Sequence, residues 1–188
     1  MRKTSLNSVY ECIKRKIKPM LIFELDNSIL QQRSIKSCPH KYLPDNYNTS
    51  IWLDGNLFSL LVNLDSYNLI DNDIVCFQHP ERKNIEEEID KLLELNIVNI
   101  KSINKMKILY KDNNYLPIEH NQLHETCILV RKHNESINNI NEEWEKCINI
   151  CHRDQLSFDF LLWKHNVKYQ SIPIKQRPVL KCSHSEKG

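Results

Sequence analysis

The sequence predicts an α/β fold, in which helices cover a central sheet. Short apolar runs, typical of buried strands, recur along the chain, and segments with the apolar spacing of helices lie between them. Polar clusters follow directly at the ends of predicted strands, where α/β domains bind their ligands. The 188 residues suit one compact domain, which we expect to span residues 1–188.

Apolar runs predict buried strands over residues 20–25, 49–53, 74–78 and 127–131. We also expect an extended segment over residues 167–174 and a polar tail over residues 178–188. The apolar spacing predicts helices over residues 4–17, 28–37, 57–64, 84–95, 101–111, 137–150 and 155–164. The helix over 84–95 is the clearest, because Ile85, Ile89 and Leu92 share one face and acidic residues occupy its first turns.

The composition argues against several classes of protein. The net charge of +2, from 26 basic and 24 acidic residues, is too small and too evenly mixed to predict a nucleic-acid surface. The 7 cysteines are an odd number without a CxxC pair, which argues against a disulfide framework or a structural zinc site. The basic N-terminus is not followed by the apolar segment of a signal peptide, and no apolar run has the length of a membrane span. We therefore expect a cytoplasmic protein in a reducing compartment.

The choice of residues is strongly biased. There is no alanine and there are only 2 glycines, whereas isoleucine, asparagine and lysine are abundant. This bias is typical of an AT-rich genome, such as that of a parasite, a bacterium or a large virus. For a viral source we expect the host cytoplasm or the virion as the location.

The first polar cluster, Asp54-Gly55-Asn56, comes directly after the strand predicted over 49–53. Gly55 permits a tight turn, and Asp54 and Asn56 offer two oxygen ligands, which suit a hard divalent ion such as Mg²⁺ or Mn²⁺. The alternative is an ordinary turn, in which both side chains bind their own backbone. The spacing alone favours the turn.

The second cluster runs from His79 to Arg82, after the strand predicted over 74–78. Arg82 could bind a phosphate or carboxylate with two N–H groups, and Pro80 would hold His79 in an extended conformation. A simple strand-to-helix turn explains Pro80 and Glu81 but not the flanking histidine and arginine.

The third cluster comprises His152, Arg153, Asp154 and Gln155, at the start of the helix predicted over 155–164. Asp154 could cap that helix or orient a sugar hydroxyl, and His152 could bind a metal ion or have no such role. Because ligands of α/β sheets bind beyond the carboxyl ends of strands, one crevice could gather all three clusters.

Arg33 and Lys36 are close to one turn apart on a predicted helix and so share a face. They could bind a diphosphate, although a solvated basic face is the commoner outcome.

The ordered set of segments resembles the hexosyltransferase-like family of plants, bacteria and large viruses, long known only as a domain of unknown function. The resemblance covers roughly residues 30–165, and the segments that carry it are 39–45, 50–56, 79–82, Glu87-Glu88, Glu125, 128–134, Trp144 and 153–158.

The resemblance implies a fold like that of GT-A glycosyltransferases: a Rossmann-like, three-layer α/β/α domain with a mostly parallel sheet. It implies transfer of a hexose from UDP- or GDP-hexose to a glycan or protein acceptor. Asp54 and Asn56, with His152, would bind Mn²⁺ or Mg²⁺, whereas Asp154, Gln155 and Arg153 would be catalytic. The residues expected to contact substrate are Arg33, Lys36, Trp52, His79, Arg82, Arg131 and His133.

One family feature has no counterpart in the sequence. Family members begin with a strand and a glycine-rich turn that hold the nucleotide base, but residues 1–18 contain no glycine. A degenerate domain that binds glycan or protein without catalysis is therefore the alternative function. Phosphoryl transfer or a nuclease activity at a two-carboxylate site is a third hypothesis, which the lack of a second acid near Asp54 in sequence disfavours. A sheet that lacks one strand could also cover its edge by forming a homodimer.

Overall fold

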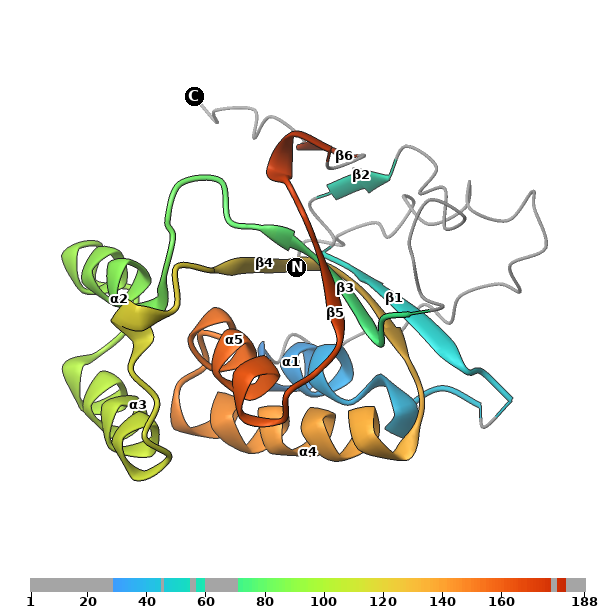
Figure 1. The fold of residues 1–188 in the computed structure, drawn as a ribbon, viewed down its shortest axis with the longest axis horizontal. Helices are drawn as coiled ribbons and strands as arrows, with labels where there is room; N and C mark the ends of the chain where they lie inside the picture. Colours follow the sequence, from blue (N-terminus) through green and yellow to red (C-terminus); the bar gives the residue numbers. More distant parts are fainter. Residues whose placement is uncertain (1–28, 45, 55–56, 60–70, 177–178, 182–188) are drawn as a thin grey trace, which may run out of the picture.

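A computed structural model of the chain describes residues 29–44, 46–54, 57–59, 71–176 and 179–181. The helix predicted over 4–17, the strand predicted over 20–25 and the residues Gly55 and Asn56 lie outside these ranges. The described part confirms a mixed α/β architecture (Figure 1).

Four strands form the main sheet, in the order β1-β4-β3-β5. They are β1 (Thr49–Leu53), β3 (Ile74–Gln78), β4 (His124–Lys132) and β5 (Tyr169–Ile172). β4 runs antiparallel to both β1 and β3, and only β3 and β5 pair in parallel. The prediction of a mostly parallel sheet is therefore wrong for the strands that the structure describes.

The direction of β4 follows from the path of the chain after β3. Two helices, α2 (Ile85–Glu94) and α3 (Ile100–Asp112), and the short helix η4 (Pro117–Glu119) lie between these strands. These helices bring the chain back to the end of the sheet at which β3 stops. His124 at the start of β4 therefore pairs with Gln78 at the end of β3. An alternation of strands and helices looks the same in the sequence whichever edge the chain returns to.

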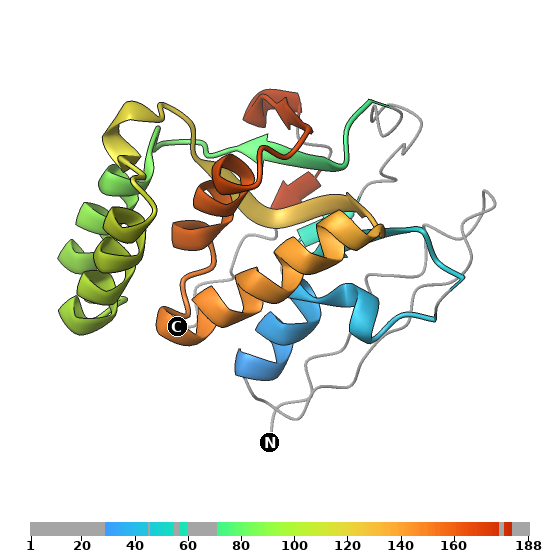
Figure 2. The same ribbon diagram turned by 60° about the horizontal axis from the view of Figure 1, so that its bottom comes forward.

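The helices α1 (Ile29–Ser37), α4 (Glu135–Ile150) and α5 (Gln155–Lys164) pack against one another below the sheet, and α2 and α3 lie beside them (Figures 1 and 2). Trp144, Leu156 and Phe160 form part of the core between helices and sheet. A second helix layer, expected from the resemblance, is not among the described elements. The other face of the sheet is nevertheless buried, since Val75 and Ile128 have no exposed surface.

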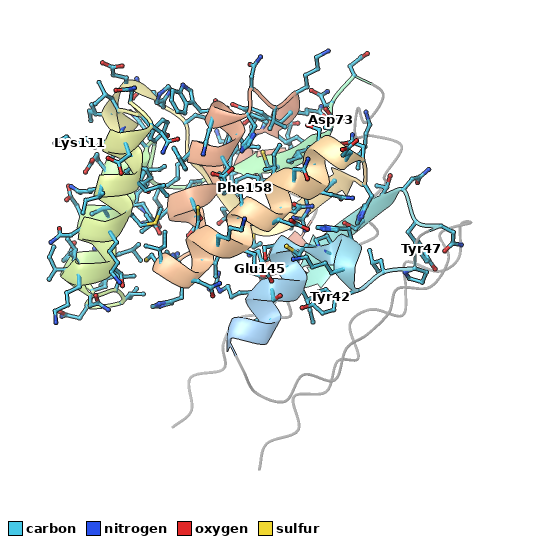
Figure 3. All side chains as sticks on the ribbon, turned by 90° about the horizontal axis from the view of Figure 1, so that it is seen from below. Tyr42, Tyr47, Asp73, Lys111, Glu145 and Phe158 are labelled. Carbon is cyan, nitrogen blue, oxygen red and sulfur yellow. The ribbon has the colours of Figure 1, made fainter. Side chains whose placement is uncertain are left out.

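The contact between α1 and α4 is partly polar. The Ser34 hydroxyl lies 2.8 Å from the Tyr42 hydroxyl and also donates a hydrogen bond to the Glu145 carboxylate. Lys41, in the short helix η2 (Pro39–Lys41), reaches the same carboxylate at 2.9 Å. Figure 3 shows Tyr42 and Glu145 at this contact. The contact holds α1 against a helix more than 100 residues later in the chain.

Two predicted segments differ from the structure. Residues 57–59, predicted as part of a helix, form the strand β2 (Leu57–Ser59), which pairs antiparallel with β6 (Val179–Lys181). The strand β6 lies within the segment predicted as a polar tail, residues 178–188. The two three-residue strands hydrogen-bond to each other through their backbones. Neither is long enough to show the alternation of apolar and polar residues that predicts a strand.

Asparagine takes over the roles that other residues usually have at helix ends. Asn84, Asn99 and Asn134 precede α2, α3 and α4, and each side chain accepts a hydrogen bond from a backbone N–H three residues later. Three others follow helices with positive φ angles, namely Asn96, Asn114 and Asn166 at 54°, 55° and 48°. Glycine usually occupies such positions, and this chain has only 2 glycines.

Arg131 holds the C-terminal end of α1. Its buried guanidinium donates to the carbonyl oxygens of Lys36 and Ser37, the latter at 3.2 Å, and to the Asn141 side chain at 3.0 Å. These carbonyls have no partner within the helix, so the arginine satisfies them and opposes the negative end of the helix dipole.

No helix in the described ranges is long and apolar enough to cross a membrane. The five cysteines in the same ranges are thiols.

We predict that Arg131→Lys lowers the free energy of unfolding by about 2–4 kcal/mol, because one ammonium group leaves some of the three buried acceptors without a donor. Urea unfolding measures the change. The control is Lys132→Met on the same strand, which removes a half-buried pair with Asp73 and should cost less than about 1 kcal/mol. Equal losses in the two variants would contradict this role of Arg131.

Candidate functional site

The ends of β1 and β3 meet the beginning of β4 at one edge of the sheet. Asp54 directly follows β1, and its backbone N–H donates to the Cys127 carbonyl at 2.9 Å. His79 directly follows β3, and its N–H donates to the Leu123 carbonyl at 2.7 Å. The start of α5 reaches the same edge, where the Thr126 hydroxyl donates to the Asp154 carboxylate at 2.9 Å.

Asp154 is a buried acid at this edge and binds two cations from α1. Arg33 Nη1 lies 2.5 Å from Oδ1, and Lys36 Nζ lies 2.6 Å from Oδ2. Burial alone would raise the pKa of Asp154, but the charges of Lys36 and Arg33 and the hydrogen bond from Thr126 hold this pKa far below its usual range. Asp154 is therefore a permanent carboxylate at neutral pH.

The side chain of Asp154 does not cap α5, which was the alternative role predicted for it. Its backbone carbonyl instead accepts hydrogen bonds from the Trp144 indole and the Ser157 hydroxyl, both at 3.2 Å. These two bonds fix the residue while the carboxylate turns toward α1.

Lys36 links Asp154 to Asp54. Its buried ammonium lies 3.5 Å from Asp54 Oδ1 and donates to the Thr126 hydroxyl at 3.1 Å. The Trp52 indole donates to the same Asp54 oxygen at 2.7 Å, and Lys36 lies 5.8 Å from the centre of the Trp52 ring. Asp54 is about one third exposed, at 32%, and its Oδ2 has no partner among the described residues. Among the described residues, one oxygen of Asp54 is therefore held and the other has no partner.

Glu88 repeats the arrangement of Asp154 in the second cluster. Its carboxylate has no exposed surface and binds the guanidinium groups of Arg82 and Arg153, with Arg153 Nε at 3.1 Å. Both arginines are partly exposed. We call the set Arg33, Lys36, Asp54, Arg82, Glu88, Thr126, Arg153 and Asp154 the strand-end site.

His79 supports Arg82. Its Nδ1 accepts the backbone N–H groups of Glu81 and Arg82, at 3.2 and 2.9 Å, and Arg82 Nη2 lies 2.9 Å from its Nε2. Burial, followed by the charge of Arg82, lowers the pKa of His79, so the ring is neutral at physiological pH. His79 thus shapes the turn that presents Arg82.

The other predicted site residues lie in different places. Gln155 is buried beside Asp154 and makes no side-chain hydrogen bond to the described residues, whereas His152 is exposed in the loop before α5. Arg131 and His133 lie toward the opposite end of β4, where Arg131 binds α1. The structure therefore does not bring these last two residues to the strand-end site.

Sequence reasoning missed Glu88 and Thr126. Glu88 was interpreted as part of an acidic first turn, yet it lies three residues after Ile85 and four before Leu92, on the apolar face of α2. A charged residue on such a face is rarely buried without a partner, which is the signal that could have identified it. Thr126 gives no comparable signal in the sequence.

The metal-binding residues remain a prediction. No group of three histidine, cysteine or acidic side chains in the described ranges is placed to hold a metal ion. Asp154 has both oxygens paired with cations, which leaves Asp54 as the candidate ligand on the part of the strand-end site that can be described.

A second buried network lies along β4 from the strand-end site. The His124 ring pairs with the Asp159 carboxylate of α5 through Nδ1, and its Nε2 lies 2.9 Å from the Ser171 hydroxyl of β5. Burial would lower the pKa of His124, but Asp159, with a smaller effect from Cys76, raises it to about 10. The set has the composition of a nucleophilic triad, but an imidazolium is unable to accept a proton from serine. It is an ion pair that joins three elements.

A charged site beyond strand ends, in an α/β domain, is the arrangement typical of enzymes of this class. The family model of the TOD1/MUCI70 glycosyltransferase-like domain matches residues 30–179, and the chain belongs to that family. This match confirms the resemblance stated from the sequence and extends beyond residue 165. Searches of the curated proteins and of the solved structures gave no significant match.

We predict that Lys36→Met lowers the free energy of unfolding by about 3–5 kcal/mol, because it takes one of two cations from a buried carboxylate. Guanidinium chloride unfolding measures the loss. In the matched control, Lys107→Met removes the exposed pair with Glu86 and should cost less than about 1 kcal/mol. The role assigned to Lys36 is wrong if both variants lose the same amount.

The His124–Asp159 pair predicts a loss of stability at high pH. His124 has a pKa of about 10 in the folded chain and about 6.5 when unfolded, so its stabilisation is complete below pH 6.5 and falls as pH rises toward 10. Across this pH range, the free energy of unfolding should fall less steeply with rising pH for His124→Gln than for the parent chain. The exposed His152→Gln serves as control and should follow the parent. Parallel curves for all three proteins would refute the prediction.

Proposed function

We propose that the chain is a glycosyltransferase that moves a hexose from UDP- or GDP-hexose to a hydroxyl of a glycan or protein acceptor. Membership of a glycosyltransferase-like family supports glycosyl transfer. The geometry supports the strand-end site as the place where the donor diphosphate binds. The identity of the donor, the transferred hexose and the need for a metal ion are parts of the proposal.

The single observation that carries the proposal is that two buried carboxylates each hold two cations at one edge. Asp154 holds Arg33 and Lys36, and Glu88 holds Arg82 and Arg153. Arg82 also pairs with the exposed Glu81 carboxylate at 3.0 Å, so with Asp54 included four cations face four carboxylates. The edge therefore offers partly exposed guanidinium groups held in fixed orientations, and such groups can stabilise the negative charge that grows on a leaving diphosphate as the glycosidic bond breaks.

Asp54 is the residue that would hold a divalent ion. Its Oδ2 has no partner among the described residues and suits an ion such as Mn²⁺ or Mg²⁺. Ions of this kind bind one or two carboxylates of a protein and complete their coordination shell with water and substrate phosphates. When bound, Mn²⁺ or Mg²⁺ would supply Lewis-acid stabilisation of the leaving diphosphate. Lys36 and Trp52 would keep the carboxylate oriented by holding its other oxygen.

Asp154 acts by charge and position in this proposal. Because its pKa is far below the usual range, it neither gives nor takes a proton near neutral pH. It orients Arg33, which is about one fifth exposed, at 20%, and can donate further N–H groups to the donor. Gln155, next to it, has an amide without a partner in the described ranges and is the candidate for a sugar hydroxyl.

Calorimetric titration with Mn²⁺ and UDP- or GDP-hexose tests the donor site. We expect binding by the parent chain and a loss of at least about tenfold in affinity for Asp54→Ala, since changes even outside a metal's direct ligands cost that much. The matched control is Asp73→Ala. Asp73 is equally exposed, at 30%, but lies at the other end of β3, beside α4 (Figure 3).

Donor binding without release of free hexose or transfer to an acceptor would favour the non-catalytic alternative. The absence of any nucleotide-sugar binding at millimolar concentrations would refute the proposed donor site. So would an equal effect of the Asp54 and Asp73 variants.

A further inference from the structure

A pocket of about 220 Å³ lies away from the strand-end site, between the C-terminal half of α5, the segment after α3 and the start of β5. Pockets for drug-sized ligands usually measure roughly 300–1,000 Å³, so this one suits a smaller molecule, such as a single ring. None of the residues already assigned to the strand-end site lines it.

One wall of the pocket is aromatic. The rings of Tyr115 and His120 are stacked, with centres 4.7 Å apart and planes 5° from parallel. Trp163 packs against Tyr115, with ring centres 4.9 Å apart, and remains 40% exposed. An exposed indole at a pocket mouth offers a flat apolar platform with a polar N–H.

The lining of the pocket also carries neutral hydrogen-bonding groups. Gln122 is oriented by the Tyr169 hydroxyl, which donates to its amide oxygen at 2.8 Å. Asn166 also lines the pocket, and it is held in the left-handed conformation at the end of α5, where its exposed amide makes no hydrogen bond to the described residues. A few fixed polar groups beside an apolar wall are the usual composition of a small-molecule site.

Tyr115 adds a hydroxyl group to the pocket lining. The residue as a whole is only 2% exposed, and the structure gives its hydroxyl no hydrogen bond within the described part of the chain. A ligand in the pocket can therefore exchange a hydrogen bond with this hydroxyl.

The charge of the pocket restricts the class of ligand. Asp159 is the only acid among its described lining residues, and the protonated His124 ring already neutralises it. The described lining contains no lysine or arginine. An aromatic pocket with a free carboxylate would bind a quaternary ammonium group, but a neutralised carboxylate removes that attraction.

We propose that this pocket binds one neutral pyranose ring of a glycan chain. The C–H face of the ring lies on Trp163, and its hydroxyl groups meet Tyr115, Gln122 and Asn166. Trp163 follows Asp154 by nine residues of α5, or about 14 Å along the helix, so the pocket can anchor an acceptor glycan whose end reaches the strand-end site. Only this acceptor role rests on the proposed transferase function.

The test is a two-dimensional amide NMR titration with methyl glycosides of glucose, galactose and mannose, without metal or nucleotide. We expect saturable shifts of the Trp163 indole and of Asn166. Trp163→Ala should weaken binding at least about tenfold, and Tyr115→Phe, which keeps the ring, roughly threefold to tenfold. Ile108→Ala, which changes an exposed apolar residue of α3, is the matched control and should bind like the parent.

Glycoside shifts that do not saturate at tens of millimolar, or that survive Trp163→Ala, would overturn the proposal, as would preferential binding of tetramethylammonium. The Asp54→Ala variant separates the two functions, because it should bind glycosides like the parent. Retained glycoside binding in a chain that binds no nucleotide-sugar would refute the proposed donor site and leave the pyranose pocket standing.

Discussion

The buried carboxylate of Asp154 is stable in the folded chain only because Arg33 and Lys36 reach it from α1. An isolated charge at this depth would cost several kcal/mol, and each cation offsets that cost at close range. The ion cluster therefore fixes the position of α1 relative to α5 and β4, although α1 lies about 90 residues before β4 and more than 100 before α5. Arg131 completes the constraint by holding the carbonyl groups at the end of the same helix.

The same constraint would prepare the edge for the diphosphate that we propose binds there. Asp154 and Glu88 are too buried to bind a ligand themselves, and their role is to hold partly exposed guanidinium groups in place. Charges that are oriented before the substrate arrives need no reorganisation during the reaction, which is the main source of electrostatic catalysis. Asp54 differs from both, because it is about one third exposed and one of its oxygens has no partner in the described part of the chain.

Local sequence patterns predicted most of the described elements but not the way they pair. The strands at 49–53 and 74–78 and the helix at 155–164 were predicted with the bounds observed, because their apolar runs end at strong polar signals. The direction of β4 and the pairing of β2 with β6 depend on contacts distant in sequence, which periodicity does not encode. The positions of Asp54, Arg82 and Asp154 at the ends of strands or the start of a helix predicted that they would lie at one edge. Glu88 was missed because a charged residue in the first turn of a helix is usually exposed, whereas this one lies on the buried face of α2.

The most direct test of the central claim is paramagnetic broadening of amide signals by Mn²⁺ in the presence of UDP-hexose and, separately, GDP-hexose. The account predicts that one of these donors brings Mn²⁺ to the strand-end site, with broadening strongest at Asp54 and extending to Lys36 and Arg153. Signals of Asp73 at the far end of β3 should stay sharp. Broadening that is centred elsewhere, or that is unchanged when the donor is left out and Asp54 is replaced by alanine, would contradict the account.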